Sequence, residues 1–442
     1  MKIQPADSLN GKIRLPGDKS ISHRAAILSA LAEGETRIEN FASSADCAST
    51  LDCLRNLGVE IGKEDSTVTV KGVGKKGFTK PSAPLDCGNS GTTMRLLAGV
   101  LAGQDFDSIL VGDESLSKRP MKRIIAPLEL MGAKIEAEDN HAPLKIYGRN
   151  SLQPISYNLP VASAQVKSCV LLAGLNAVGK SIVLNPSSKF QTPNSRNHTE
   201  LMLRYLGADI QEKFVETNGE FIEEISIGGG SILTAKDLIV PSDVSSAAFF
   251  LVGASCLENS EIVLENVGLN STRTAILEVL RRFGADIEIL NQREICSEIV
   301  GDIRVIGHKN LSPETNSNLV SGDIIANLID EIPVLAVFGT QIENGLEIRG
   351  AEELRVKESD RIAAVVENLR RMNATVEEFS DGFRVEKSDL KGAKIDSFGD
   401  HRIAMAFAIA ALLADGETEI GGAEHAGISF PEFFATLASV RK

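Results

Sequence analysis

The sequence is short of positive charge: 46 Lys and Arg stand against 60 Asp and Glu, which gives a net charge of −14. This balance excludes a general nucleic-acid binder or an anionic-membrane binder, because phosphate groups require a basic face. Long hydrophobic runs are missing too, since the two longest, residues 247–257 and 403–414, are too short to span a bilayer. Residues 1–17 lack the apolar segment of a signal peptide, so we expect a cytoplasmic protein.

Cysteine is scarce, with six residues and no C-x-x-C pair, and most of them lie in apolar segments where we expect buried thiols. Hydrophobic residues make up 43% and charged residues 24% of the chain, as in ordinary globular proteins. A chain of this size can build its core without disulfides or a metal. The length of 442 residues suggests two or three domains.

What the sequence does have is a helix-opening motif that recurs six times, each time with small polar residues before a run rich in Ala and Leu. A helix start presents unpaired N–H groups and a partial positive charge, so it favours anions. Lys or Arg in the first turn opposes the helix dipole by about 0.3–1 kcal/mol, a cost that a bound anion would offset. The six motifs predict one site for an anionic ligand, and the alternative is scattered, solvated surface charge. The motifs begin at Gly17, Gly88, Ala162, Ser242, Ile329 and Gly399, and the cations are Lys19, Arg24, Arg95, Arg361 and Arg402.

A second repeated feature closes the helices. Gly58, Gly132, Gly207 and Gly284 each follow an amphipathic helix and precede a strand, at intervals of 74, 75 and 77 residues, and Asn373 follows after 89 more. Such spacing indicates internal duplication of a supersecondary element. Gly past the last helical turn is the expected left-handed cap.

Six repeats suit two domains of three. We predict one domain of residues 18–240 and a second of residues 1–17 with 241–442, joined by two crossings. Residues 12–16 are expected to form a strand that pairs with the C-terminal half. The first repeat is expected to have helices at 20–32 and 47–57, strands at 36–39, 59–61 and 67–71, and a turn at 33–35; the fourth is expected to have helices at 245–256 and 273–283 and strands at 261–265 and 286–290.

Residues 174–181 match the P-loop pattern G-x-x-x-x-G-K-[ST], which cradles phosphates only between a strand and a following helix. Here we expect the reverse order, with a helix at 166–175 and a strand at 181–185. The stretch also aligns with helix-to-strand turns of other repeats. A P-loop nucleotide-binding protein is therefore a weaker alternative.

Three motifs carry a resemblance to a known family. They are residues 18–24 (DKSISHR), 88–95 (GNSGTTMR) and 355–361 (RVKESDR), with further matches at 118–121 and at Asp330 and 400–402. In this order, from Leu15 to Pro431, they resemble the signatures of the enolpyruvyl transferases, specifically the 5-enolpyruvylshikimate-3-phosphate synthase family.

The resemblance implies an α/β fold, a two-domain inside-out α/β barrel of six βαβαββ repeats whose helix N-termini face the interdomain cleft, with domains that close on substrate. It also implies transfer of the enolpyruvyl group of phosphoenolpyruvate to the 5-hydroxyl of shikimate 3-phosphate, by addition and elimination, with release of phosphate. This reaction belongs to the shikimate pathway, toward chorismate and the aromatic amino acids. No metal and no organic cofactor are implied, and we expect a monomer.

The residue types suit this reaction, because both substrates are multiply charged anions that must be held against their mutual repulsion. A charge pair at about 4 Å is worth about 4 kcal/mol at an effective dielectric of about 20, and Arg grips a carboxylate or phosphate with two parallel hydrogen bonds. Without the matched motifs, each Arg could equally form a surface ion pair instead of binding a substrate. By match to the family, phosphoenolpyruvate is held by Arg119, Arg361 and Arg402, with Gly91 leaving room beside it and Asn89 close by. Shikimate 3-phosphate is held by Ser20, Arg24, Ser163, Ala164, Gln165, Arg196, Asp330 and Lys357, Lys19 touches both substrates, and His401 belongs to the site as a structural residue.

The chemistry needs one proton placed on the methylene carbon and one taken from the hydroxyl, which calls for two carboxylates with pKa values set apart by their surroundings. Our hypothesis is that Asp330 accepts the hydroxyl proton, while Glu358 donates a proton to the methyl carbon and later removes it. Lys19 would stabilise the departing phosphate. Without the resemblance, Glu358 could equally be a helix salt bridge.

The sequence departs from the family's pattern at four places. Ala164 stands where many members have a second serine, so one phosphate hydroxyl is missing. Arg196 stands in place of a tyrosine and could replace it as a phosphate ligand. Glu353 stands where many members have Asn, and Ile428 stands where a late Lys contacts phosphoenolpyruvate.

The family's glycine beside phosphoenolpyruvate is kept as Gly91, and Ala at this position is the familiar route to glyphosate tolerance. We therefore expect a glyphosate target that retains sensitivity, to a degree that Leu96, in place of the usual Pro, leaves open.

Two other functions compete with this one. The sister enzyme that transfers enolpyruvyl to UDP-N-acetylglucosamine uses a Cys on a mobile loop, and no Cys lies near Arg119. A catalytically silent scaffold that binds an anionic metabolite would not need Asp330 and Glu358 beside its cations.

Overall fold

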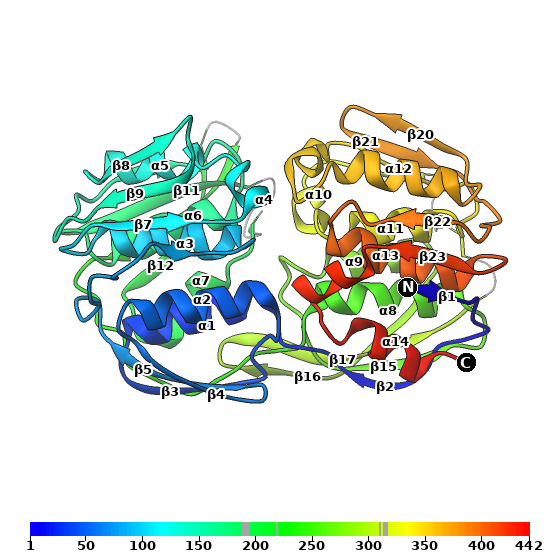
Figure 1. The fold of residues 1–442 in the computed structure, drawn as a ribbon, viewed down its shortest axis with the longest axis horizontal. Helices are drawn as coiled ribbons and strands as arrows, with labels where there is room; N and C mark the ends of the chain where they lie inside the picture. Colours follow the sequence, from blue (N-terminus) through cyan, green and yellow to red (C-terminus); the bar gives the residue numbers. More distant parts are fainter. Residues whose placement is uncertain (188–194, 218–219, 309–310, 313–316) are drawn as a thin grey trace. The chain divides into compact units, whose positions relative to one another are not determined.

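The chain folds into two compact units in a computed structural model that describes residues 1–187, 195–217, 220–308, 311–312 and 317–442 (Figure 1). One unit, called here the 19–240 unit, consists of residues 19–240 and 295–298. The other, called the 241–442 unit, consists of residues 1–18, 241–294 and 299–442. Among the described residues, no helix is long and apolar enough to cross a membrane.

The 19–240 unit contains three complete repeats. Its helices are α1 (Lys19–Leu31), α2 (Ala45–Asn56), α3 (Gly91–Ala102), α4 (Glu114–Ser117), α5 (Lys122–Leu130), α6 (Ala164–Gly174) and α7 (His198–Tyr205). Its strands are β3 (Glu33–Glu39), β4 (Glu60–Glu64), β5 (Thr67–Val73), β6 (Leu85–Asp86), β7 (Ser108–Val111), β8 (Lys134–Glu138), β9 (His141–Tyr147), β10 (Ser156–Asn158), β11 (Lys180–Ser187), β12 (Ile210–Thr217), β13 (Glu220–Gly228) and β14 (Leu238–Ile239).

The 241–442 unit also includes the N-terminal strands. Its helices are α8 (Val244–Cys256), α9 (Ala275–Arg282), α10 (Ile324–Leu328), α11 (Ile332–Gly339), α12 (Arg361–Arg371), α13 (His401–Leu413) and α14 (Phe433–Val440), with 3-10 turns η1 (Glu352–Val356) and η2 (Ala423–Ile428). Its strands are β1 (Lys2–Ile3), β2 (Asn10–Arg14), β15 (Glu261–Gly268), β16 (Asp286–Ile295), β17 (Glu298–Ile306), β18 (Leu319–Val320), β19 (Leu346–Ile348), β20 (Val376–Phe379), β21 (Gly382–Val385), β22 (Lys394–Asp396) and β23 (Thr418–Gly421).

Each repeat builds its own small sheet. In the second repeat, β6 and β7 are parallel and joined by α3, and the hairpin β8–β9 follows α5, which gives the strand order β6-β7-β9-β8. The third and fifth repeats follow the same order, β10-β11-β13-β12 and β18-β19-β21-β20. The mixed α/β architecture and the βαβαββ repeat are therefore as the sequence predicts.

The first and fourth repeats take their outer strand from a distant part of the chain. Strand β14 pairs in parallel with β3, and β2 pairs in parallel with β15. The expected pairing of the N-terminal strand with the C-terminal half is confirmed. The chain passes between the units near Asp18 and near Pro241, and again on either side of residues 295–298.

The sixth repeat is shorter than the others. Its described strands form a three-stranded sheet in the order β1-β23-β22, completed by the N-terminus, and η2 and α14 follow where another repeat has its hairpin. A second difference concerns residues 33–35, where we expected a turn. These residues begin strand β3 and pair with Lys71–Val73 of β5, so Gly34 lies inside the ladder.

The helix-closing residues adopt the backbone conformation that their role requires. Gly58, Gly132, Gly207 and Gly284 have φ between 88° and 94°, and Asn373 has φ of 67°. Only the left-handed region lets the chain turn from the last helical turn into the next strand here.

Residues 174–181, which match the P-loop pattern, have helix α6 before them and strand β11 after them, which is the expected order and the reverse of a P-loop.

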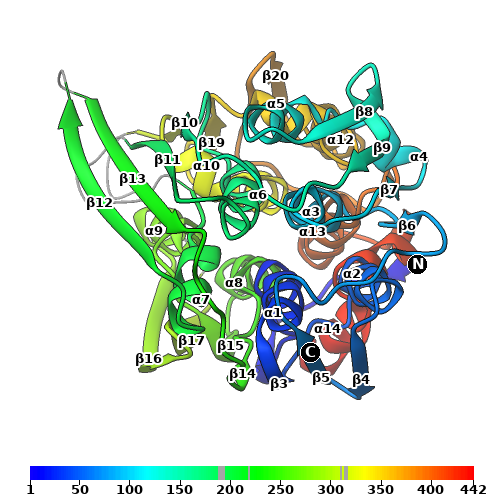
Figure 2. The ribbon, with the colours of Figure 1, turned by 90° about the vertical axis from the view of Figure 1, so that its left-hand side faces the viewer.

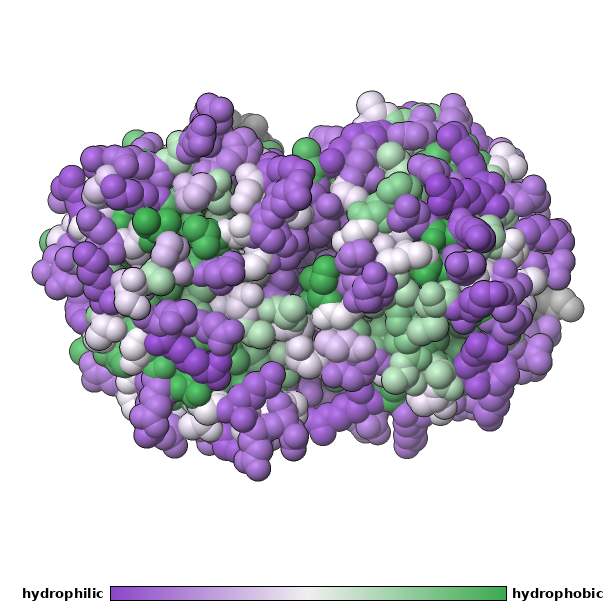
Figure 3. Space-filling view, in the orientation of Figure 1, coloured by the Kyte–Doolittle hydropathy of each residue, from purple (hydrophilic) through white to green (hydrophobic). Residues whose placement is uncertain are grey.

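The core of each unit is built from apolar helices surrounded by sheets. In the 19–240 unit, α1, α3 and α6 are buried and lie inside the sheets, and all three are seen almost end-on in Figure 2. In the 241–442 unit, the buried helices are α8, α11 and α13. On the face drawn in Figure 3, hydrophilic residues predominate and hydrophobic ones form small groups, as the high net charge suggests. Because these helices are apolar along most of their length, the polar residues of their first turns are the ones that can bind a ligand or move a proton.

Candidate active site

Each unit carries a cluster of charged side chains at its helix starts, and the cluster of the 19–240 unit begins at α1. Lys19 is the first residue of α1, and its Nζ lies 3.0 Å from Oδ2 of Asp46, near the start of α2. Both side chains remain partly exposed, at 20% and 12%. A partly exposed ammonium group at a helix start can bind an anion by exchanging one carboxylate contact for another.

Arg24 lies one turn further along α1 and is buried. Its Nε donates a hydrogen bond of 2.7 Å to Oγ1 of Thr199, and its Nη2 donates one of 2.9 Å to Oγ of Ser168. Its Nη1 donates to the carbonyl of Ser20 at 2.9 Å. The guanidinium plane is thus fixed from three helices, α1, α6 and α7.

The first turns of α3 and α6 are joined by side chains. Arg95 Nη1 donates to Oε1 of Gln165 at 2.6 Å, and Gln165 Nε2 donates to Oγ1 of Thr92 at 3.0 Å. Ser163 is the N-cap of α6 but makes no side-chain cap bond. Gly91 starts α3, and a Cβ built on it would lie 2.7 Å from Nη1 of Arg95. The space beside Gly91 is therefore limited by an arginine that itself orients Gln165.

Arg119 is oriented by the loop that precedes α3. Its Nη2 donates to Oδ1 of Asn89 at 2.7 Å and to Oγ of Ser115 at 3.2 Å, while Asn89 Nδ2 donates to Asp113 at 2.8 Å. Arg196, which precedes α7, lies with Nη1 3.4 Å from Oγ of Ser20. The 19–240 unit thus carries five predicted cations at or near its helix starts. They are Lys19, Arg24, Arg95, Arg119 and Arg196.

Beside this cluster lies a buried ion pair that sequence reasoning missed. Lys167 Nζ lies 2.5 Å from Oε1 of Glu200 and 4.0 Å from Oε2 of Glu223, and all three side chains are fully buried. Burial raises the pKa of Glu223, although the charge of Lys167 opposes the rise. Lys167 precedes Ser168 and Glu200 follows Thr199, so the pair fixes the two residues that hold Arg24. Nothing in the local sequence distinguishes these residues from surface charges.

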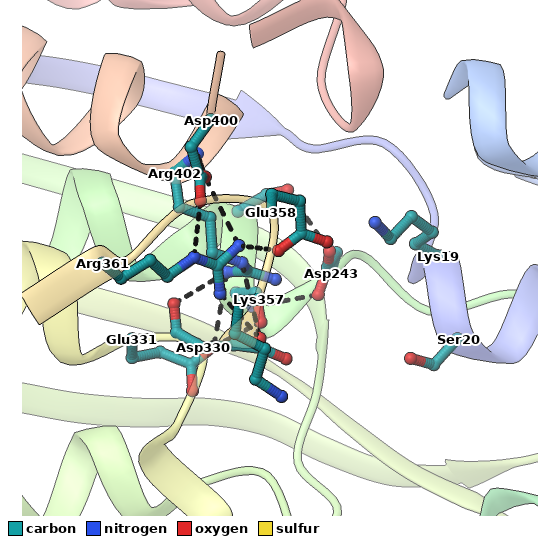
Figure 4. Close-up of polar contacts among 12 residues, drawn as sticks. Lys19, Ser20, Asp243, Asp330, Glu331, Lys357, Glu358, Arg361, Asp400 and Arg402 are labelled. Carbon is teal, nitrogen blue, oxygen red and sulfur yellow. Dashed lines mark hydrogen bonds and ion pairs between the residues drawn. The ribbon is translucent and has the colours of Figure 1, made fainter. Parts of the chain in front are cut away.

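The cluster of the 241–442 unit is centred on Arg361, the first residue of α12, whose side chain is 1% exposed (Figure 4). Its Nε donates to Oδ2 of Asp400 at 2.8 Å, and its Nη2 donates to Oε2 of Glu358 at 2.7 Å. Its Nη1 lies 3.5 Å from Oδ1 of Asp330. One guanidinium group thus contacts three carboxylates that come from three different sequence motifs.

Arg402 lies beside this group at the start of α13. Its Nη1 donates to the backbone carbonyl of Asp330 at 3.0 Å, and its Nε lies 3.6 Å from Oδ1 of the same residue. Asp400 is the N-cap of α13, and its side chain accepts from the backbone N–H of Arg402 at 2.8 Å. His401 is buried in the first turn of the same helix. These motif residues therefore lie together in this unit.

Burial and charge act in opposite directions on the acids and bases of this cluster. Burial alone would lower the pKa of Arg361, but the charges of Asp400 and Glu358 outweigh it, so the pKa is raised and the group stays charged. Burial alone would raise the pKa of Asp400, but the charge of Arg361 outweighs it and lowers that pKa. Asp400 is fully buried, whereas the side chains of Asp330 and Glu358 are each 18% exposed. The two partly exposed carboxylates are the ones available to a substrate.

Lys357 lies in the same motif and is paired within it. Its Nζ lies 2.8 Å from Oε1 of Glu353, the acid that stands where many relatives were expected to have Asn. An acid at this position therefore serves as the counter-ion of Lys357. A substrate anion that binds Lys357 must compete with this carboxylate.

A further network of this unit was not predicted. The buried Arg273 contacts Asp18 and Asp243 and donates a 2.6 Å hydrogen bond to Oγ of Ser245, which in turn hydrogen-bonds to Oε1 of Glu331. Asp243 and Ser245 belong to a helix-opening motif, which is the one feature of the sequence that pointed to this network.

Among the described residues, no group of three or more His, Cys, Asp or Glu side chains could hold a metal ion.

Comparison with known proteins places these motifs in a family. A family model described as EPSP synthase (3-phosphoshikimate 1-carboxyvinyltransferase) matches residues 3–437. The chain belongs to the EPSP synthase family. The resemblance drawn from the sequence motifs is confirmed, and this family is favoured over both the UDP-N-acetylglucosamine transferase and the P-loop protein.

Relatives named 3-phosphoshikimate 1-carboxyvinyltransferase cover almost the whole chain. The protein of Solibacter usitatus is 49% identical over 441 residues, which is 99% of each chain, and that of Salinibacter ruber is 50% identical over 443 residues, 99% of this chain and 98% of its own. An EPSP synthase structure from Acinetobacter baumannii superposes with a TM-score of 0.86 at 42% identity and covers 100% of this chain and 98% of its own. The enolpyruvyl transferase NikO from Streptomyces tendae, at 17% identity and a TM-score of 0.78, shares the fold; it covers 99% of this chain and 96% of its own.

Proposed function

We propose that this protein transfers the enolpyruvyl group of phosphoenolpyruvate to the 5-hydroxyl of shikimate 3-phosphate and releases phosphate. The observation that carries the proposal is the gathering of Arg361, Arg402, Asp330 and Glu358 at helix starts in one unit of a member of the EPSP synthase family. Guanidinium groups at helix N-termini bind carboxylate and phosphate oxygens. Two partly exposed carboxylates beside them can move protons.

We assign phosphoenolpyruvate to Arg119, Arg361 and Arg402. Arg119 is held by Asn89, and Arg361 is held by Asp400, so both guanidinium planes are fixed. Fixed donors bind a planar carboxylate at a low entropy cost. Gly91 lies next to Arg119, since a Cβ added to this glycine would lie 3.6 Å from Nη1 of Arg119, which supports a role in leaving room for this substrate.

We assign shikimate 3-phosphate to the helix starts of the 19–240 unit and to Lys357. Arg24 is fixed by Ser168 and Thr199, and its geometry supports recognition of an anionic group. Because Ala164 has no hydroxyl, it can offer only its backbone N–H, and Arg196 supplies the charge that replaces the missing contacts. The other residues of this set are Lys19, Ser20, Ser163, Gln165, Asp330 and the neighbouring His401.

We assign the proton transfers to Asp330 and Glu358. Both carboxylates contact the same guanidinium group of Arg361, at 3.5 Å and 2.7 Å. Two carboxylates held by one guanidinium group lie close enough together to act in sequence as a base and an acid, with Asp330 on the hydroxyl and Glu358 on the methyl carbon.

The direct test is phosphate release by the purified protein with phosphoenolpyruvate and shikimate 3-phosphate. We expect release with this pair and none when UDP-N-acetylglucosamine replaces shikimate 3-phosphate or when ATP or GTP is supplied alone. Release with UDP-N-acetylglucosamine or a nucleotide instead would refute the proposal. We also propose that the protein works as a monomer in the cytoplasm, which light scattering and cell fractionation test.

The proton assignments are tested by Asp330→Asn and Glu358→Gln, because each keeps the shape of the side chain but removes its proton-accepting group. General acid–base catalysis contributes about 100-fold to 10,000-fold, so kcat should fall by at least about 100-fold. Glu367→Gln is the matched control, since Glu367 pairs with Arg371 on the exposed side of α12. Near-normal turnover of either test variant would remove the role given to that residue.

A further inference from the structure

The strongest unexplained feature is the buried Arg273, which lies outside every residue assigned above. It is held in the turn that precedes α9, where its backbone N–H donates to the carbonyl of Asn270 at 2.8 Å. The side chain of Asn270 also accepts hydrogen bonds from Thr272, at 3.0 Å from its N–H and 2.7 Å from its hydroxyl. This turn is tightly enclosed, because Asn270, Thr272 and Arg273 are all buried. Burying a charged group costs free energy unless the group is paired and hydrogen-bonded, so the contacts of Arg273 indicate its role.

Arg273 contacts both segments, near Asp18 and near Pro241, where the main crossings of the chain between the units begin and end. Its Nη1 lies 3.8 Å from Oδ2 of Asp18, and its Nη2 lies 3.4 Å from Oδ1 of Asp243. The backbone already pairs these segments, since Asp18 N donates to the carbonyl of Pro241 at 2.8 Å and Asp243 N donates to that of Pro16 at 3.0 Å. Arg273 therefore neutralises two carboxylates that would otherwise repel each other across the paired segments.

Arg273 is also connected, through Ser245 and Glu331, to Arg402, which is a proposed phosphoenolpyruvate ligand. Its Nη2 donates to Oγ of Ser245 at 2.6 Å, so the hydroxyl proton of Ser245 is directed to Oε1 of Glu331. The side chain of Glu331 is fully buried, and its Oε1 lies 3.9 Å from Nη1 of Arg402. Glu331 is also the N-cap of α11 and follows Asp330 directly in the chain. A shift of Glu331 would move both Arg402 and Asp330.

We propose that Arg273 is a positioning residue for the transferase reaction, which acts through Ser245 and Glu331 to fix Arg402 and Asp330. This inference rests on the proposed function, because it takes Arg402 as a phosphoenolpyruvate ligand and Asp330 as the base. The planar guanidinium group reaches Asp18 with one terminal nitrogen, and Asp243 and Ser245 with the other. The ammonium group of a lysine would keep the charge but not this geometry.

Steady-state kinetics of Ser245→Ala, Arg273→Lys and the parent protein test the inference. Ser245→Ala leaves the contacts of Arg273 with Asp18 and Asp243 in place and removes only the link to Glu331. We expect KM for phosphoenolpyruvate to rise by about tenfold and kcat to fall by about as much, the effect of losing one member of a coupled network. KM for shikimate 3-phosphate should rise less than KM for phosphoenolpyruvate, because among its assigned ligands only Asp330 depends on Glu331. The thermal unfolding midpoint should fall by a few degrees, because Glu331 loses a buried hydrogen bond. Arg273→Lys should give the same separation of the two KM values.

Arg281→Met is the matched control, because Arg281 lies on the adjacent helix α9 and donates to the carbonyl of Ile287. It should leave both KM values unchanged. Parent-like kinetics of Ser245→Ala, or an equal rise of KM for both substrates, would overturn the inference and reduce Arg273 to a structural residue. A parent protein that releases no phosphate with the two substrates would instead overturn the proposed function, so the two failures are distinguishable.

Discussion

Asp400 offers the sharpest test of how the structure supports its candidate site, because one buried carboxylate performs three tasks. Its Oδ2 accepts from Nε of Arg361 at 2.8 Å and from Oγ of Ser359 at 3.2 Å, and its Oδ1 accepts from the backbone N–H of Arg402 at 2.8 Å. Replacement by alanine removes the cap of α13 and leaves the guanidinium group of Arg361 without its closest buried counter-ion. The first loss costs about 1 kcal/mol, and the second costs about 3–5 kcal/mol.

The two losses overlap, since the same atoms serve both, and we expect Asp400→Ala to destabilise the 241–442 unit by about 4 kcal/mol. At about 2–4 °C per kcal/mol for a folding unit of this size, the unfolding midpoint should fall by about 10 °C. Asp400→Asn keeps a good cap and the shape of the side chain but loses the charge, so its midpoint should lie between those of Asp400→Ala and the parent.

Differential scanning calorimetry at neutral pH measures these midpoints. Asp415→Ala is the control, because it removes an exposed carboxylate whose partner Lys391 is also exposed, and its midpoint should equal that of the parent. The pKa of Asp400 is lowered in the folded protein, so its contribution is present at neutral pH and is lost as the pH falls through that lowered pKa. The difference between Asp400→Ala and the parent should therefore shrink in acid. An Asp400→Ala midpoint equal to that of the parent at neutral pH would refute the reasoning.

Three further predictions follow from single side chains. Burial and the neighbouring carboxylate raise the pKa of Asp243 from 3.8 to about 6, so this group should lower the free energy of unfolding by about 3 kcal/mol as the pH rises from about 3 to about 7. Urea unfolding of Asp243→Asn should lack this pH dependence. Gly91→Ala places a Cβ 2.7 Å from Nη1 of Arg95 and should raise both KM for phosphoenolpyruvate and the inhibition constant for glyphosate. If the parent protein is inhibited only by millimolar glyphosate, the expected sensitivity is contradicted. Lys75 donates to the carbonyl of Leu175 at the end of α6 at 3.0 Å, and Lys75→Met should lower the thermal midpoint through a loss of about 1–2 kcal/mol, which calorimetry detects.

The parts of the fold that local chemistry determines could be predicted from the sequence. Helices begin where Ser90, Asp243 and Asp400 cap them, as the helix-opening motifs indicate, and they end at glycines with positive φ such as Gly58. Capping and left-handed turns depend on a few adjacent residues, so a sequence contains all the information about them. The extent of strand β3 was missed because a glycine in a ladder looks like a turn until its partner strand is known.

The site was predicted only as far as its motifs extend. Arg361, Asp400 and Glu358 lie within or next to recurring patterns, and the structure brings the three together. Arg273 was not predicted, because its partner Asp18 is hundreds of residues away in the chain and its own surroundings look like an ordinary helix start. The buried pair of Lys167 and Glu200 was missed for the same reason. The division into domains at residues 18 and 240, with hinges at the crossings, stays a prediction.

The central claim is that the residues of the two clusters serve one group transfer, and the most direct test is to follow the phosphorus atoms of both substrates. Phosphorus NMR of the purified protein with phosphoenolpyruvate and shikimate 3-phosphate should show the phosphoenolpyruvate signal replaced by inorganic phosphate. The shikimate phosphate should stay esterified in a new product that mass spectrometry identifies as carrying the added enolpyruvyl group. Unchanged signals, or loss of the phosphate from shikimate 3-phosphate itself, would contradict the account.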